Sequence, residues 1–110
     1  MALIKPIDPI TASEWLDNHE AIIIDVRELA EYNEVHIDGA HLIPVNTVCI
    51  NKLPSNIKNK KVIVHCMLGK RGGIACEKLL SENPNLDIYN LTGGIVAWEN
   101  AGLKCKKRDA

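Results

Sequence analysis

The chain has 110 residues, of which 46% are hydrophobic and 25% charged, and its formal net charge is −1. This length fits one domain with an ordinary core, and the near-neutral charge excludes binding of nucleic acid through a strong positive field. No apolar run reaches the ~20 residues of a membrane span, and the N-terminus lacks the features of a signal peptide, so we expect a cytoplasmic protein.

The first ten residues are expected to form a non-helical lead-in, because Pro6 and Pro9 discourage helix. A short helix follows, and the spacing of Thr11 and Glu14 is that of a capping box. Nothing in this stretch indicates chemistry, so we expect its role to be structural.

A buried strand is predicted over residues 21–24, and Asp25 follows at its carboxyl end. Asp25 can lie at the rim of an active site, or it can have a structural role, capping the next helix or pairing with an arginine. We favour the structural role. Arg27 and Glu31 are four residues apart, a spacing that places them on one helical face, where they can pair. A short polar helix is expected over residues 28–34.

Two histidines, His36 and His41, flank the turn that comes next. Either can act as a general base in isolation, but hydrogen bonds to the backbone are the favoured interpretation. A short extended segment is expected over residues 42–45, and a helical turn within residues 46–53.

The centre of the chain holds the most informative stretch. Residues 62–64 form an apolar run typical of a buried parallel strand. Cys66 follows and opens a six-residue loop that ends at Arg71, after which a helical pattern extends to about residue 82. The order is therefore strand, cysteine-led loop and helix.

Such a loop is suited to a negatively charged sulfur. A short loop entering a helix directs several backbone N–H groups at one point, with the positive end of the helix behind them. Gly69 permits backbone dihedrals that other residues avoid, while Lys70 and Arg71 add positive charge. These surroundings favour the thiolate of Cys66. A small core cysteine is the alternative, but the loop, the cations and the helix together favour a reactive thiol.

The last third of the chain contains another strand and helix. Residues 86–91 alternate apolar and polar side chains and predict a strand near the sheet edge. A tight turn follows at residues 92–94, whose glycine pair can face the Cys66 loop. Trp98, in the next short helix, is expected in the core, and residues 104–110 are expected to be a frayed basic tail.

Three stretches, in this order along the chain, resemble the signatures of the rhodanese (sulfurtransferase) family. They are DVRELAEY at 25–32 with HIDGA at 36–40, Cys-x-x-Gly-x-Arg at 66–71, and LTGGIVAW at 91–98 with AGL at 101–103. The resemblance covers about residues 8–103. It implies one rhodanese domain over residues 1–110, with an α/β fold whose mostly parallel, five-stranded sheet has helices on both faces. It also implies that Asp25 and Arg27 support the fold.

The chemistry implied is that of a thiosulfate sulfurtransferase. The Cys66 thiolate takes a sulfane sulfur from thiosulfate or a persulfide, then passes it to an acceptor such as cyanide or a thiol. The N–H groups of Met67 to Arg71 hold the outer sulfur, and Lys70 and Arg71 steer the anionic donor. No metal or organic cofactor is needed. A protein donor or acceptor can dock on the apolar pair Met67 and Leu68, where thiosulfate-using relatives often carry a basic residue.

Other functions remain open at this point. Phosphatases and arsenate reductases use a related loop, but theirs is one residue longer than residues 66–71. A sulfur relay without catalysis, or a sensor of oxidants or nitrosating species, would use the same cysteine. With no secretion signal and no CxxC pair or zinc-ligand spacing, we expect reduced thiols. Cys76 is expected in the core, whereas Cys49 or Cys105 can be a resolving thiol only if the fold brings it close.

Overall fold

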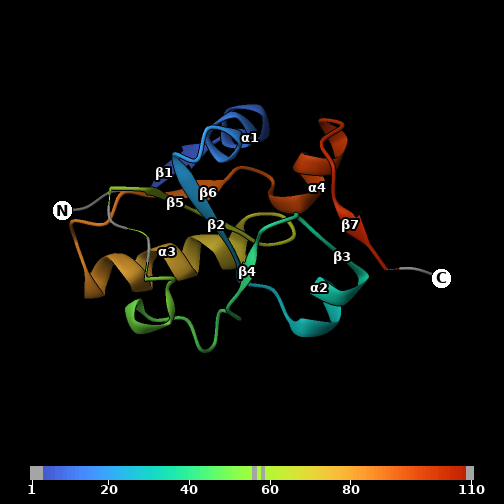
Figure 1. The fold of residues 1–110 in the computed structure, drawn as a ribbon. Coiled ribbons are helices and arrows are strands. Elements are labelled where there is room, and N and C mark those ends of the chain that lie inside the picture. The colour runs from blue at the N-terminus through green and yellow to red at the C-terminus, as the bar shows by residue number, and fades with distance from the viewer. Residues whose placement is uncertain (1–3, 56, 58, 109–110) are drawn as a thin grey trace.

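A parallel sheet of five strands organises the molecule (Figure 1). The computed structural model describes residues 4–55, 57 and 59–108. The strands, in spatial order, are β1 (Lys5–Ile7), β6 (Ile88–Leu91), β5 (Lys61–His65), β2 (Ala21–Asp25) and β4 (His41–Leu42). Each neighbouring pair runs parallel, which confirms the predicted α/β class and the five-stranded parallel sheet.

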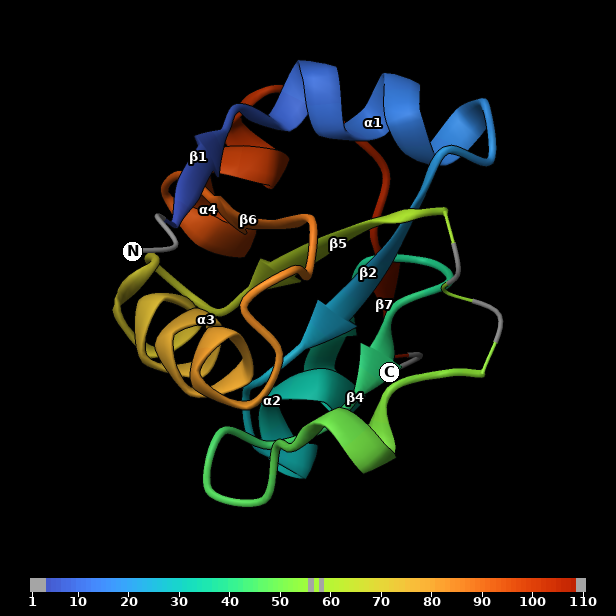
Figure 2. The same cartoon turned by 90° about the vertical axis from the view of Figure 1, so that its left-hand side faces the viewer.

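Helices cover both faces of this sheet, as predicted (Figure 2). On one face lie α1 (Pro9–Asp17) and α4 (Gly94–Asn100), and on the other lie α2 (Leu29–Glu34) and α3 (Lys70–Glu82). Every residue of β2 is buried, as expected for a parallel strand covered on both sides. Successive residues of β2 and β5 therefore alternate between two hydrophobic cores. Ile22, Ile24, Val62 and Val64 belong to the core with α3, and Ala21, Ile23 and Ile63 to the core with α1 and α4.

The N-terminal segment differs from its prediction in two ways. The lead-in contains strand β1, where Pro6 is tolerated because an edge strand has one unpaired side. Helix α1 begins at Pro9, since proline fits the first helical position, where its missing N–H is not needed. The cap is the Asp8 carboxylate, which accepts a hydrogen bond from the Thr11 N–H at 3.1 Å. The predicted capping box beginning at Thr11 was wrong.

Strand pairing confirms one further expectation and corrects another. β6 lies second from the edge, which confirms the position expected near the sheet edge, but the edge strand itself is β1, in the segment expected to be a lead-in. The basic tail is ordered through Arg108, because β7 (Lys106–Lys107) pairs antiparallel with β3 (Val35–His36). The Arg108 N–H also donates to the Glu34 carbonyl at 2.9 Å. Residues 109–110 of the predicted tail lie outside the described residues. A 3-10 turn at Ile50–Lys52 (η1) confirms the helical turn expected there.

Candidate functional site

Cys66 lies directly after β5, at the carboxyl end of the sheet, and the loop that follows leads into α3 at Lys70. The residue is 1% exposed. Its Sγ accepts a hydrogen bond from the Gly69 N–H, with an N···S distance of 3.0 Å. Gly69 has φ +118° and is the N-cap of α3, a conformation that favours glycine. The loop therefore turns back on its own cysteine and directs a backbone donor at the sulfur.

Helix α4 fixes the same loop from the side. The Ile95 N–H donates to the Cys66 carbonyl at 2.9 Å, and the Val96 N–H donates to the Met67 carbonyl at 3.3 Å. Gly94 has φ +59°, and a Cβ at this position would overlap both carbonyl groups. The predicted approach of the glycine pair to the Cys66 loop is confirmed, and it depends on the absence of a side chain at Gly94.

The open side of the loop is apolar. Met67 is 45% exposed and Leu68 66% exposed, although buried positions are usual for side chains of this type. Lys70 is also exposed. The rim around the buried cysteine thus combines two exposed apolar side chains with one exposed ammonium group.

Arg71 is held by a carboxylate on α2. Its Nη1 and Nη2 donate to Glu31 Oε1 and Oε2 at 2.7 and 3.0 Å. These hydrogen bonds lower the pKa of Glu31 from its usual 4.5 to about 2. The expected pair between Arg27 and Glu31 was wrong, because α2 begins at Leu29 and Arg27 lies before the helix.

At the carboxyl ends of β2 and β5, Asp25, Arg27 and His65 form a buried polar group. Arg27 donates to Asp25 through Nε and Nη2, at 3.0 and 2.8 Å, and Nη2 also donates to the Val35 carbonyl at 2.7 Å. Asp25 therefore forms the ion pair favoured from the sequence, with Arg27 as the arginine. Asp25 pairs with His65 across the sheet, and His65 Nε2 lies 3.6 Å from Asp25 Oδ2. Burial lowers the pKa of His65, and the Asp25 charge opposes this effect.

The remaining candidate residues lie away from any such cluster or in the core. His36 Nδ1 lies 3.0 Å from the Tyr32 carbonyl, which confirms the expected backbone hydrogen bond, while His41 is exposed on the edge strand β4. Cys76 is fully buried, as predicted, and burial raises its pKa to about 12. Cys49 and Cys105 are partly buried free thiols.

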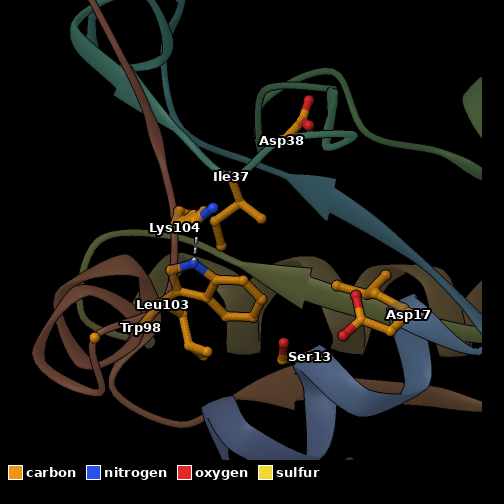
Figure 3. A pocket seen from close by; sticks show the side chains of 9 residues that line it. Ser13, Asp17, Ile37, Asp38, Trp98, Leu103 and Lys104 are labelled. Atoms are coloured by element: carbon orange, nitrogen blue, oxygen red, sulfur yellow. Dashed lines mark hydrogen bonds between the residues drawn. The ribbon is translucent and has the colours of Figure 1, made fainter.

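Trp98 is 5% exposed and belongs to the core, as predicted. Its indole N–H donates to the Lys104 carbonyl at 3.0 Å. The ring lines a hollow of about 460 Å³. Figure 3 shows it together with Ser13 and Asp17 of α1 and with Ile37 and Asp38. Among the described residues that line the hollow, none comes from the loop 66–71. The hollow is therefore separate from the Cys66 site.

Sequence reasoning missed two polar residues near the loop, His65 and Asn90. The Asn90 side chain donates from Nδ2 to the Gly69 carbonyl at 3.0 Å. No local sequence pattern marks either residue. His65 joins the site because β5 lies beside β2, and Asn90 joins it because β6 lies beside β5.

Comparison with known proteins agrees with this geometry. Residues 8–101 match the family model described as the rhodanese-like domain. A protein named sulfurtransferase from Allochromatium vinosum is 31% identical over 107 residues, covering 92% of this chain and 94% of that protein. The crystal structure of a thiosulfate sulfurtransferase from Pseudomonas aeruginosa superposes with a TM-score of 0.81 at 21% identity, over 99% of this chain and 20% of that one. This last likeness concerns the fold.

Several relatives are much longer than this chain. A Mycobacterium tuberculosis protein named "Probable adenylyltransferase/sulfurtransferase MoeZ" is 35% identical over 97 residues, covering 84% of this chain and 24% of that protein. The chain likewise spans 55% of a Synechocystis relative and 25% of a tRNA uridine(34) hydroxylase from Erwinia tasmaniensis. Within the described part of the chain, none of the helices has the length and hydrophobicity needed to cross a membrane. The match over residues 8–101 shows that the chain belongs to the rhodanese-like domain family.

Proposed function

We propose that this protein is a sulfurtransferase that carries a sulfane sulfur on Cys66. The observation that carries the proposal is the Gly69 N–H, which lies 3.0 Å from Cys66 Sγ at the N-terminal end of the 13-residue helix α3. A backbone donor and a positive helix end stabilise negative charge on the sulfur, as the reaction needs first for the attacking sulfur and later for the outer sulfur of the persulfide. The sulfurtransferase name of the Allochromatium vinosum relative supports the same reaction.

The reaction has two displacement steps. In the first, the Cys66 thiolate attacks the outer sulfur of the donor and forms a new S–S bond. The old bond to that sulfur breaks, and its electron pair leaves with sulfite when the donor is thiosulfate, or with a thiolate when the donor is a persulfide. In the second, cyanide or a thiolate attacks the outer sulfur, and the Cys66 thiolate leaves. The charges balance without a metal or an organic cofactor.

The loop residues have distinct proposed roles. The backbone N–H groups of Met67 to Arg71 bind the negative outer sulfur, as an oxyanion hole binds oxygen. Lys70, which is exposed, supplies the long-range charge that steers an anionic donor. Asp25 and Arg27 support the loop through their buried ion pair, 2.8 Å between Oδ2 and Nη2.

We further propose that the donor is a persulfide, either on a small thiol or on a protein. A thiosulfate dianion needs compensating positive charge, yet the Arg71 guanidinium is already bound to Glu31 at 2.7 Å. The exposed side chains of Met67 and Leu68 instead offer apolar contact to the carbon part of a persulfide. A cytoplasmic location is part of this proposal, because thiols stay reduced in that compartment.

The experiment is an intact mass measurement after incubation with thiosulfate and, separately, with glutathione persulfide. We expect the parent protein to gain one sulfur atom, faster from the persulfide, and to lose it to cyanide as thiocyanate. Cys66→Ser should gain none, whereas the matched control Cys105→Ser should behave like the parent. A parent protein that gains no sulfur from either donor, or a Cys66→Ser variant that still gains one, contradicts the proposal. A sensor without transfer activity would fail to pass sulfur to cyanide.

A further inference from the structure

We propose that Asn90 is a positioning residue for Cys66, and that position 72 is glycine so that the Asn90 amide can occupy its place. The inference rests on the proposed role of Cys66 as the sulfur carrier. Asn90 lies on β6, directly across from Val64 of β5 in the sheet register. Because β5 leads into Cys66, Asn90 is carried by the strand next to the one that presents the nucleophile.

The contact made by Asn90 is with the carbonyl of Gly69. Asn90 Nδ2 donates to this oxygen at 3.0 Å. The Gly73 N–H donates to the same oxygen, also at 3.0 Å, and this is the first main-chain hydrogen bond at the start of α3. A carbonyl with two donors has little freedom to rotate. The peptide unit that joins Gly69 to Lys70 is therefore fixed from two directions, by the helix and by the sheet.

This restraint matters because Gly69 also holds the sulfur. Its N–H donates to Cys66 Sγ at 3.0 Å, and its φ of +118° lies in a region open chiefly to glycine. Glycine has no Cβ to restrict its own dihedrals, so neighbouring contacts must select the conformation. Asn90 fixes the orientation of the Gly69 carbonyl and so limits the backbone dihedrals of Gly69. In the conformation selected, the Gly69 N–H points at Cys66 Sγ. Asn90 thus acts on Cys66 through Gly69.

Gly72 provides the space for this side chain. A Cβ at position 72 would overlap Asn90 Oδ1. Oδ1 is buried, has no hydrogen-bond partner among the described residues, and lies in the space that a Cβ of residue 72 would need. Glycine within a helix is normally unfavourable relative to alanine, and the position of the Asn90 amide explains why it stands here. Gly73 differs, because a Cβ there would lie 3.7 Å from Asn90 Nδ2, an ordinary contact.

The adjacent glycines therefore provide a matched pair of variants. We would measure the rate of Cys66 alkylation by iodoacetamide as a function of pH, with peptide mass mapping to separate the four cysteines. Asn90→Ala should slow the reaction at pH 7 by about tenfold, the effect of losing one hydrogen bond, and should move the pH profile upward. Hydrogen exchange of the Gly69 amide, followed by NMR, should become faster. Gly72→Ala should reproduce both changes, because its methyl group displaces the amide, whereas Gly73→Ala should stay within about twofold of the parent.

The double variant and an isosteric variant complete the test. The double variant Asn90→Ala, Gly72→Ala should react no more slowly than Asn90→Ala alone, because the two substitutions remove the same hydrogen bond, the one from Asn90 to the Gly69 carbonyl. Asn90→Asp keeps the shape of the side chain if the alanine variant fails to fold, but its carboxylate lacks the N–H donor and should also slow alkylation. Parent-like rates in Asn90→Asp and Gly72→Ala would overturn the proposal, as would equal slowing by Gly72→Ala and Gly73→Ala. Sulfur uptake by the parent is measured separately: its absence contradicts the proposed function, while the alkylation rates still decide the role of Asn90.

Discussion

Arg71 and Glu31 form a two-point ion pair, with N···O distances of 2.7 and 3.0 Å, between the first turn of α3 and helix α2. Glu31 also accepts a hydrogen bond from the Glu28 N–H at 3.0 Å, as part of the capping box of α2. One carboxylate therefore caps a helix and binds the arginine that closes the Cys66 loop. The charge that the loop offers to an anionic donor is reduced as a result.

Glu31→Gln should make thiosulfate a better donor. Glutamine retains an oxygen for the capping box but leaves the Arg71 guanidinium without a counter-charge. At a site that is about one quarter to one third exposed, the freed charge should lower the KM for thiosulfate by about three- to tenfold, equivalent to about 1 kcal/mol. The KM for glutathione persulfide should change less. Initial rates at low ionic strength measure both constants.

The matched control for this change is Glu34→Gln, which removes the same charge from the same helix but from a pair with Arg108. Its KM for thiosulfate should remain close to that of the parent. Equal improvement in both variants would mean that net charge alone governs donor use. No improvement in Glu31→Gln would mean that Arg71 does not limit binding of the dianion.

The ion pair between Arg71 and Glu31 should make the free energy of unfolding depend on pH in the acid range. Hydrogen bonds from Arg71 hold the pKa of Glu31 at about 2, below its usual 4.5. Because the pKa of Glu31 is lower in the folded state than in the unfolded state, the ionised carboxylate stabilises the fold at any pH above the unfolded-state pKa. This contribution to the free energy of unfolding is lost as the pH falls from about 4.5 toward 2. Allowing for solvent screening, we expect a loss of about 1–2 kcal/mol. Urea unfolding from pH 6 to pH 2 should show this loss in the parent and not in Glu31→Gln, whereas parallel curves would contradict it.

Gly94→Ala should damage the fold at the site more than the same change at Gly102. Both glycines have positive φ, +59° and +79°, so alanine costs about 1–2 kcal/mol of backbone strain at each position. At Gly94 the methyl group would also overlap the carbonyls of Cys66 and Met67, whereas at Gly102 nothing lies within 4 Å. We expect Gly94→Ala to lose about 2 kcal/mol more than Gly102→Ala. Urea unfolding measures the difference, and equal losses would contradict the close approach of α4 to the loop.

The sequence was sufficient for features that depend on neighbouring residues. The buried strands that include residues 21–24 and 62–64 have continuous apolar runs, and the helix after Cys66 has an apolar face. Each pattern is complete within a few residues. The order strand, cysteine, glycine, helix then fixed where the thiol would lie, because parallel strands present their carboxyl ends at one edge of a sheet.

Features that depend on distant partners could not be predicted in this way. Strands β1 and β7 have three and two residues, and each exists only because β6 or β3 pairs with it. The spacing of Arg27 and Glu31 suggested a pair, but the fold offered each a better partner, Asp25 and Arg71. Sequence spacing shows which residues can pair within one helix, but it does not show which charged residues of other helices or strands will lie close to them.

Arg27→Met should be the most destabilising change near the site. Asp25 and Arg27 are 0% and 2% exposed, and removal of one partner leaves a buried charge without compensation, which costs about 3–5 kcal/mol. Asp25→Asn combined with Arg27→Met should recover part of this loss, because the remaining charge is gone. Lys5→Met breaks the exposed pair with Asp87 and should cost about 1 kcal/mol or less. Urea unfolding of the three variants measures these losses. If the double variant is no more stable than Arg27→Met, Arg27 stabilises the fold chiefly through its 2.7 Å hydrogen bond to the Val35 carbonyl.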